Sequence, residues 1–403
     1  MEEWKEYRIG DVCDTISDTY RGNAENVILI NTSDVLEGKC LNHIKVPNKD
    51  LKGQFKKTFR KDDILYSEIR PANKRYAYID FDATDYIAST KLMVIRHNER
   101  ILPQYLFYIL KSQAVLDELQ MLAESRSGTF PQITFSEVAN MEIKLPPIEQ
   151  QRRILGVLKS LDDKIEVNRR INENLEQQAQ ALFKSWFVDF EPFKDQPFVE
   201  SELGMIPQGW KVGCLDDLCS FISRGLTPKY DETSDELILG QTCVRNNIVT
   251  LNNARKHRPK SKTEKWVQQW DILLNSTGIG SLGRVGVVYF NMDNVAIDSH
   301  ITVVRTSKSL YRHYVGRNLL SRQLEIENMA VGSTGQTELP RDRVKTMTII
   351  VPSDDALTKF NYIIEPMALT MYRNIEENKR LAELRDTLLP RLMSGELKVN
   401  DVI

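Results

Sequence analysis

The stretch "IEQQRRILGVLKSLDDKIEVNRRINENLEQQAQALFKSWFVDF" at residues 148–190 reads as one long amphipathic helix. Counting in sevens gives two parallel lines of mostly apolar residues. The lines are Ile154, Leu161, Asn168, Leu175 and Leu182, and Leu158, Ile165, Asn172, Ala179 and Trp186. Apolar residues at this spacing form the seam of a coiled coil. The stretch therefore predicts a helix that packs against another helix.

A second helix with the same spacing is predicted near the end of the sequence. Its two lines are Phe360, Met367, Asn374, Leu381 and Leu388, and Ile364, Met371, Asn378, Arg385 and Leu392. Asparagines interrupt both seams at the same steps, and such polar residues fix register and partner. We therefore expect Asn168 and Asn172 to approach Asn374 and Asn378. The alternative is that each helix packs only on its own globular domain. Pro366 removes a helix hydrogen bond and should kink the second helix or delay its start.

The sequence outside the two helices repeats as well. Trp4–Lys5 returns as Trp210–Lys211, at an offset of 206 positions. Further on, Asp63 returns at Asp271, Arg96 at Arg305 and Tyr105 at Tyr314, so small insertions raise the offset to 209 before Pro146 returns at Pro352, again 206 positions on. A period this long is too large for a solenoid, so it indicates a duplicated domain.

Each copy reads as a globular part with short strands, followed by its long helix. We predict an α+β fold in which two duplicated mixed α/β domains each precede a helix, and the helices pack as an antiparallel coiled coil. The expected parts are domain 1 at 1–147, the central helix at 148–190, a linker with domain 2 at 191–352, and the C-terminal helix and tail at 353–403. About 35 to 40 helical residues span roughly 50 to 60 Å. This arrangement would hold two heads at a set distance.

Composition indicates a soluble protein in a reducing compartment. The chain has 403 residues, of which 41% are hydrophobic and 27% charged. No apolar run approaches the roughly 20 residues of a membrane span, and the charged N-terminus lacks a signal-peptide core. The five cysteines show no CxxC pair, which argues against a disulfide framework or zinc site. We expect a cytoplasmic protein without a membrane partner.

Basic residues are concentrated at comparable places in the two copies, although the net charge is only −2. The runs are "LKGQFKKTFRK" (51–61) and "RKHRPKSKTEK" (255–265), each just upstream of a "DIL" sequence. The residues in question are Lys56, Lys57, Arg60, Arg255, Lys256 and Arg258. One run alone would be interpreted as a solvated loop. Its recurrence favours a surface that faces a polyanion.

The loops after the two "DIL" sequences carry side chains suited to reading DNA. They supply Arg70, Asn73, Lys74 and Arg75 in the first copy, and Asn275, Ser276, Thr277 and Arg284 in the second. Arginine pairs with guanine, and asparagine with adenine, through two hydrogen bonds each. The second loop contains "GIGSLG" (278–283), which fits GxGxxG, but another strand rather than a helix is predicted next. A dinucleotide site is therefore rejected in favour of a glycine turn.

The sequence lacks the motifs of a self-contained enzyme. Its one Pro-Pro pair, Pro146–Pro147, is not followed by the aromatic residue of an amino-methyltransferase motif, and no Pro-Asp dipeptide begins a nuclease motif. A Walker A sequence and HExxH are also missing, and the five histidines are scattered. We predict no catalytic or metal-binding residues. Three readings compete, namely a DNA-binding module, an enzyme, which would need a catalytic motif that this chain lacks, and a coiled-coil scaffold.

Long stretches of the sequence resemble the specificity (S) subunits of type I restriction–modification systems. The central helix and its exit through "EPF" are similar to the family's spacer helix, "SELGMIPQGWKVGCLDDL" (201–218) to the entry of its second target-recognition domain, and "LAELRDTLLPRLMSGELKV" (381–399) to its C-terminal helix end. "GSTGQTELPRDRVKTMTIIVP" (332–352) is also typical of the family. The resemblance covers essentially the whole chain.

This resemblance implies two target-recognition domains, each reading one part of a split, asymmetric site in double-stranded DNA, with the helices as a ruler. It also implies two modification (methyltransferase) subunits, which bind S-adenosylmethionine and methylate adenine N6, and restriction subunits that translocate and cut DNA. S-adenosylmethionine, Mg²⁺ and ATP are expected on those partner subunits and no cofactor in this chain.

Overall fold

The computed structural model describes residues 4–49, 53–126, 131–258, 264–332 and 337–401. It divides into two compact units, each of which includes half of both long helices. Unit 1 consists of Met1–Glu166 and Asn378–Ile403, and unit 2 of Val167–Glu377. The described residues contain no helix that is long and apolar enough to cross a membrane.

Among its described residues, unit 1 contains two four-stranded sheets and three short α-helices. One sheet has the order β2 (Cys13–Ile16), β11 (Leu92–His97), β8 (Ile64–Ser67), β9 (Tyr76–Tyr78), and the other β6 (Lys45–Pro47), β3 (Asn26–Ile30), β10 (Tyr86–Ser89), β7 (Phe55–Lys57). The pairs β1 (Lys5–Arg8) with β12 (Glu142–Leu145), and β4 (Val35–Leu36) with β5 (Lys39–Cys40), complete the strands. The short helices are α1 (Pro103–Leu110), α2 (Gln113–Arg126) and α3 (Phe135–Asn140).

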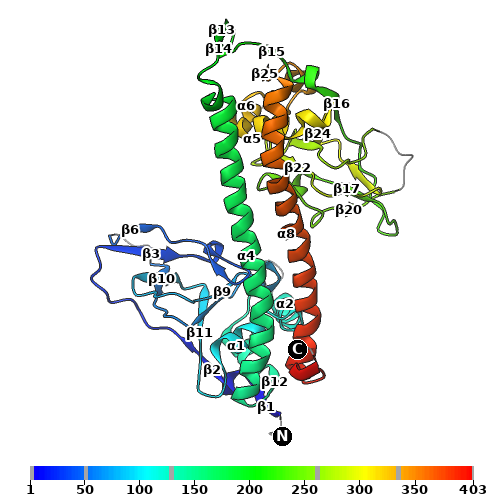
Figure 1. Ribbon diagram of the computed structural model, residues 1–403. Helices are drawn as coiled ribbons and strands as arrows, with labels where there is room; N and C mark the ends of the chain where they lie inside the picture. Colours follow the sequence, from blue (N-terminus) through cyan, green and yellow to red (C-terminus); the bar gives the residue numbers. More distant parts are fainter. Residues whose placement is uncertain (1–3, 50–52, 127–130, 259–263, 333–336, 402–403) are drawn as a thin grey trace. The chain divides into compact units, whose positions relative to one another are not determined.

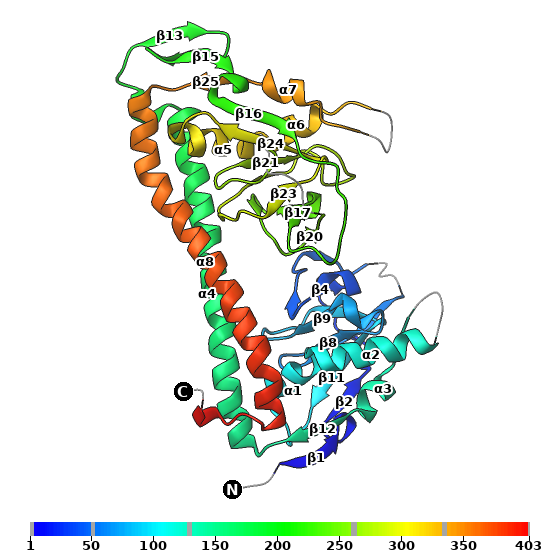
Figure 2. The same ribbon diagram turned by 90° about the vertical axis from the view of Figure 1, so that its right-hand side faces the viewer.

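The first sheet of unit 1 is buried on both faces. Ile64 and Ile95 belong to the core that includes α1 and α2, whereas Leu65 and Val94 face the core of the second sheet. Alternate residues of a strand point to opposite faces, so a continuous apolar run serves both cores. Figure 2 shows α1, α2 and α3 beside this sheet.

Unit 2 repeats this plan. Its main sheet has the order β16 (Cys219–Arg224), β24 (Ile301–Thr306), β21 (Ile272–Asn275), β22 (Val285–Val287), β19 (Ile248–Val249), β18 (Val244–Arg245). A second sheet has the order β20 (Arg255–Lys256), β17 (Leu237–Leu239), β23 (Val295–Ile297). The remaining strands are β13 (Phe198–Ser201) with β14 (Gly204–Pro207), and β15 (Lys211–Cys214) with β25 (Thr348–Val351). The short helices are α5 (Arg312–Ser321), α6 (Gln323–Asn328) and α7 (Arg341–Lys345).

The register of the terminal strand pair confirms the predicted duplication. Lys5 pairs with Leu145 in unit 1, and Lys211 pairs with Val351 in unit 2. Both partners are displaced by the same 206 positions. The parallel pairing of β3 with β10 likewise recurs as β17 with β23.

The two long helices, α4 (Ile148–Phe187) and α8 (Asp354–Ser394), lie side by side in each unit (Figures 1 and 2). In unit 1, Ile154 and Leu158 of α4 share a core with Leu388 and Leu392 of α8. In unit 2, the end of α4 meets the beginning of α8, where the rings of Phe187 and Phe360 lie 4.8 Å apart. The helices therefore run antiparallel within each unit, as predicted, and the alternative of separate packing is wrong.

The polar steps of the seam pair in unit 2. Asn374 Nδ2 donates to Asn172 Oδ1 at 2.8 Å, and Asn172 Nδ2 donates to the Met371 carbonyl at 3.1 Å. Asn168 is buried and donates to Glu377 Oε2 at 2.7 Å. The approach of Asn172 to Asn374 is confirmed. Asn378 belongs to unit 1, so its approach to the α4 asparagines stays a prediction.

Pro366 does not delay the second helix, so that alternative is wrong. Helix α8 begins at Asp354, after Ser353, whose Oγ accepts the Ala356 amide proton at 3.3 Å as a cap. Pro366 itself is exposed. Proline has no amide proton, so the carbonyl four residues before Pro366 lacks its helix hydrogen bond. This carbonyl lies on the solvent side of the helix, and the helix continues past it.

In each unit, a half-buried carboxylate of α4 binds basic side chains of neighbouring elements. In unit 1, Asp162 accepts hydrogen bonds from Tyr108, from Lys111 at 3.2 Å and from Arg385 at 2.7 Å. In unit 2, Glu176 pairs with Arg317 at 2.7 Å. Burial alone would raise the pKa of both carboxyls, but these basic partners and hydrogen bonds lower the pKa of each below its usual range.

His313 on α5 is buried and should make unit 2 sensitive to acid. Burial, followed by the charges of Arg312 and Arg317, lowers the pKa of His313 to about 3. An unfolded histidine titrates near 6.5, so the unfolded chain holds more protons between these values, and stability falls as pH falls below about 6.5. We expect about 2 kcal/mol to be lost by pH 5, since each pH unit costs about 1.4 kcal/mol. Urea unfolding of the His313→Gln variant should lack this part of the slope, and an unchanged slope would contradict the assignment.

Candidate nucleic-acid interface

A buried ion pair positions the candidate loop in each unit. Arg96 donates two hydrogen bonds of 2.7 Å to Asp63, which also accepts the Arg60 amide at 2.8 Å. Arg305 donates the same two bonds, each of 2.7 Å, to Asp271. Asp271 also accepts the Gln268 amide at 2.8 Å. In unit 1 the pair thus joins the end of the basic run to β8. In unit 2, Arg305 Nη1 also donates to the carbonyl of Glu264, near the end of the basic run, at 3.1 Å.

The loop between β8 and β9 presents Arg70 and Asn73 to solvent. Arg70 and Lys74 adopt left-handed backbone conformations, with φ of 46° and 53°. The Arg70 amide donates to the Pro131 carbonyl at 3.1 Å, which fixes the loop to the segment beyond α2. Neither the Arg70 nor the Asn73 side chain has a hydrogen-bond partner among the described residues, so both are available for a ligand.

The other predicted residues of this loop hold the fold together. Lys74 Nζ lies 3.8 Å from the Glu37 carboxylate. Arg75 Nη1 donates to the Ser33 carbonyl at 3.1 Å. Their predicted contacts with DNA would have to coexist with these internal ones.

The first basic run lies close to this loop. Lys56 and Arg60 are exposed, whereas Lys57 is half-buried and donates to the Leu92 carbonyl at 2.8 Å. Burial lowers the pKa of Lys57, although the charge of Glu68 opposes this. Glu68 begins the loop after β8 and lies 4.0 Å from Lys57. The structure therefore places Lys57 of the basic run beside the beginning of the loop.

The second basic run is exposed on and after β20. The Arg255 guanidinium stacks on the Tyr230 ring, 3.4 Å from its centroid. Lys256 Nζ donates to the Glu232 carbonyl at 3.0 Å, and Arg258 lies 3.9 Å from Asp231. The members of this run at 259–263 lie outside the described residues.

In unit 2 the glycine-containing loop is followed by strand β22, which confirms that no dinucleotide fold is present there. Asn275 and Ser276 at its base are fully buried. Asn275 Nδ2 donates to the Gln241 carbonyl at 3.1 Å, and the Ser276 hydroxyl lies 2.6 Å from that of Thr302. These two side chains support the loop from inside, and DNA contact by them stays untested.

Thr277 and Arg284 lie closer to the loop surface. The Thr277 hydroxyl lies 3.0 Å from His300 Nδ1 and accepts a bond from Gln241 at 2.6 Å. Arg284 is half-buried, and its Nη2 donates to the Gly280 carbonyl at 2.7 Å. The sequence does not single out His300 or Gln241, because only the folded chain brings them beside Thr277, from 23 and 36 positions away.

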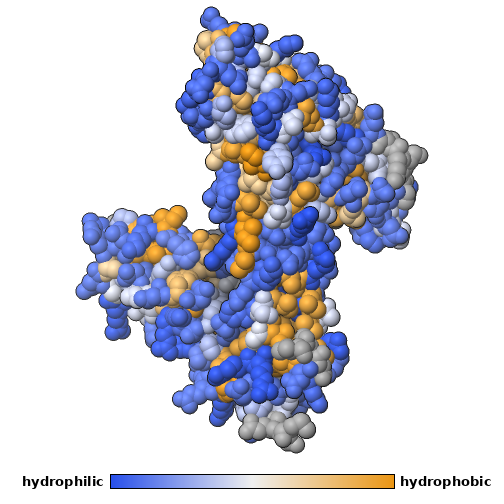
Figure 3. Space-filling view, in the orientation of Figure 1, coloured by the Kyte–Doolittle hydropathy of each residue, from blue (hydrophilic) through white to orange (hydrophobic). Residues whose placement is uncertain are grey.

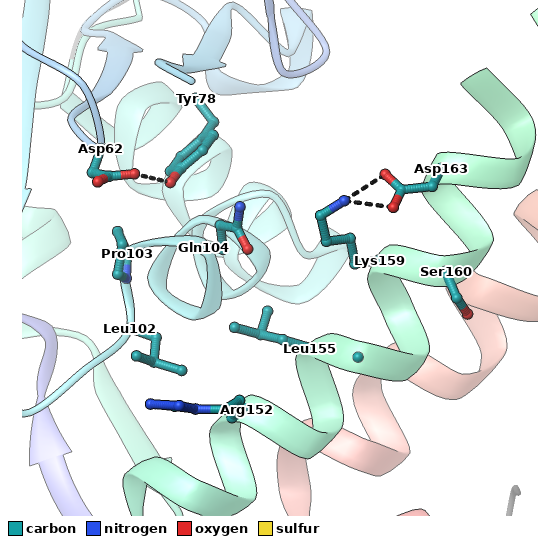
Figure 4. A pocket seen from close by; sticks show the side chains of 11 residues that line it. Asp62, Tyr78, Leu102, Pro103, Gln104, Arg152, Leu155, Lys159, Ser160 and Asp163 are labelled. Atoms are coloured by element: carbon teal, nitrogen blue, oxygen red, sulfur yellow. Dashed lines mark hydrogen bonds and ion pairs between the residues drawn. The ribbon is translucent and has the colours of Figure 1, made fainter. Parts of the chain in front are cut away.

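Unit 1 also contains a cavity of about 450 Å³ beside α4 (Figure 4). Lys159 and Asp163 form an ion pair at its edge, and Tyr78 donates to Asp62. These groups are already paired with one another. Across the described ranges no three His, Cys, Asp or Glu residues gather as a metal site, and all five cysteines are free thiols.

Comparison with known proteins places these features in a family. A model described as the type I restriction modification DNA specificity domain matches residues 1–177. The chain is 34% identical to the type I restriction enzyme HindI specificity subunit of Haemophilus influenzae, over 98% of this chain and 100% of that protein. It is 30% identical to the type I restriction enzyme MjaIX specificity subunit of Methanocaldococcus jannaschii, over 75% of this chain and 71% of the other.

A solved structure is similar in fold. It is the crystal structure of the type I restriction-modification system S subunit from M. genitalium, with a TM-score of 0.56 and 16% sequence identity. The match covers 97% of this chain and 96% of that one.

Proposed function

This chain belongs to the family of type I restriction–modification specificity subunits, and we propose that it recognises a split, asymmetric DNA site, one half per recognition domain. Its family role is to supply DNA sequence specificity rather than catalysis. One observation carries the proposal. The same sheet and the same Asp–Arg pair support a loop in both units, yet one loop presents Arg70 and Asn73 and the other a glycine turn with Arg284. One frame with two different loops suits two different half-sites.

The paired helices are proposed to set the gap between those half-sites. A helix of 40 residues, such as α4, is about 60 Å long. The globular parts contact it through Lys111 and Asp162 in unit 1, and through Arg317 and Glu176 in unit 2. Two recognition domains held on one pair of helices would then set the number of base pairs between the half-sites.

The partners are proposed to be two modification subunits, which bind S-adenosylmethionine, and restriction subunits that use ATP and Mg²⁺. A duplicated chain offers two equivalent surfaces, which supports two copies of the modification subunit. Figure 3 shows hydrophobic residues along the helical pair. Large side chains exposed on the two helices of unit 2 are Val167 of α4, 50% exposed, and Tyr362 of α8, 84% exposed. Such residues suit the docking of protein partners.

Binding by the assembled complex tests this function against a scaffold that never reads DNA. The chain would be co-expressed with its modification subunit, and its affinity measured for duplexes that contain or lack the methylated motif. We expect specific binding at least a thousandfold tighter than non-specific binding, with both weakening as salt rises. Equal binding to all duplexes would contradict the proposed function and favour the interpretation of the chain as a scaffold.

Arg284→Ala should weaken the reading of one half-site only. If its guanidinium contacts a base edge, discrimination at one position should fall by about 1–3 kcal/mol, while the other half-site stays unchanged. Methylation rates on duplexes with single base changes would measure this. Lys359→Ala, which removes an exposed cation on α8 of the same unit, provides the matched control. A uniform loss across sequences would instead indicate a phosphate contact.

A further inference from the structure

The side chain of Ile279 lies at the tip of the loop between β21 and β22 and is 92% exposed, more than any other large apolar side chain described. A single exposed apolar residue needs no explanation by itself. The position of Ile279 does need an explanation, because its side chain projects from the loop that is proposed to contact DNA in unit 2. The neighbouring backbone also fixes the loop tip on which Ile279 lies.

The loop is built to present this residue. Gly278 and Gly280 flank Ile279 with φ of 98° and 70°, conformations that residues with a Cβ rarely adopt. The amides of Ser281 and Leu282 donate to the Gly278 carbonyl at 3.1 and 2.9 Å. The Gly280 carbonyl accepts from Arg284 at 2.7 Å. Both sides of the tip are therefore fixed, and the isoleucine stands away from the unit's core.

The surroundings of the tip are polar and suited to nucleic acid. Arg284, Thr277 and His300 lie at the base of the same loop. An apolar side chain among such polar groups matches the edge of a DNA base pair in the major groove. There, the C5 methyl of thymine is the apolar group. A lipid surface or an apolar protein groove would instead require several neighbouring apolar side chains.

We propose that Ile279 is a specificity-determining residue that contacts the C5 methyl of a thymine in the half-site read by unit 2. This inference rests on the proposed function. It makes that half-site depend on a group that deoxyuridine lacks. Losing one methyl contact is worth about 0.8 kcal/mol, which corresponds to roughly a fourfold change in affinity.

The test replaces each thymine of the half-site, on both strands, with deoxyuridine in turn. Affinity of the complex with its modification subunit would be measured for the parent chain, Ile279→Ala and Ile279→Val. We expect one replacement to weaken the parent and Ile279→Val about fourfold and to leave Ile279→Ala unaffected. Thermal melting of the variants should match that of the parent, because the side chain is exposed.

Each contrary outcome is distinct. Deoxyuridine replacements without effect, or with equal effect on the parent and Ile279→Ala, would overturn the proposed contact while sequence-selective binding persisted. A uniform loss for Ile279→Ala on all duplexes would also overturn it. A parent complex that binds every duplex equally would overturn the proposed function itself.

Discussion

Inserting one heptad into both long helices is expected to widen the gap in the DNA site by about 3 base pairs. Seven helical residues add about 10.5 Å, and DNA rises about 3.4 Å per base pair. Both half-sites should stay unchanged, because neither recognition loop is altered. Mapping of N6-methyladenine in cells that express the variant with its modification subunit would report the gap and both half-sites together.

The insertions belong after Glu166 in α4 and after Glu377 in α8, the borders between units 1 and 2. There they preserve the bond from Arg385 to Asp162 in unit 1 and the bond from Asn374 to Asn172 in unit 2. An insertion in one helix alone is the matched control, since it puts the two seams out of register and should reduce stability. A paired insertion that methylates the original motif at the original gap would refute the ruler.

Asp271→Ala is expected to destabilise unit 2 by about 3–5 kcal/mol, since it leaves the guanidinium of Arg305 with no carboxylate in a largely buried position. Asp271 itself is 1% exposed. Because a domain's whole stability is about 5–15 kcal/mol, this change should reduce recognition of one half-site through unfolding. Urea unfolding would measure the loss, and Asp63→Ala should cause the corresponding loss in unit 1.

Two further variants separate the charge from the packing. Asp271→Asn keeps hydrogen-bonding atoms and should cost less than alanine. The double variant Asp271→Leu with Arg305→Met replaces the pair by apolar groups and should recover much of the stability. A loss below about 1 kcal/mol for Asp271→Ala would show that the pair does not support the loop.

The sequence predicts the parts of this fold that repeat. The heptad spacing predicts both long helices. The asparagines on the two seams predict that the helices pair with each other, because each buried polar side chain must find a hydrogen-bond partner. The recurrence of Asp63 and Arg96 as Asp271 and Arg305 marks equivalent strands. These features depend on residues whose spacing along the chain is directly visible.

The sequence does not reveal which residues of a loop face outward. Asn275 and Ser276 resemble base-reading residues in sequence, yet both are buried. Lys57 and Arg75 sit in basic stretches but donate to backbone carbonyls inside unit 1. Such roles are set by the neighbours that the sheets bring together, as with Tyr230 beneath Arg255. The start of α8 was likewise set by Ser353 and not by Pro366.

The most direct test of the central claim is long-read mapping of N6-methyladenine in the source genome, with this gene intact and with it deleted. We predict that one split, asymmetric motif, with two defined halves and a fixed gap, is methylated only when the gene is intact. Co-expression of the gene with its modification subunit in an unmethylated host should restore the same motif. Loss of a single uninterrupted motif, or unchanged methylation in both experiments, would contradict recognition by two domains on one spacer.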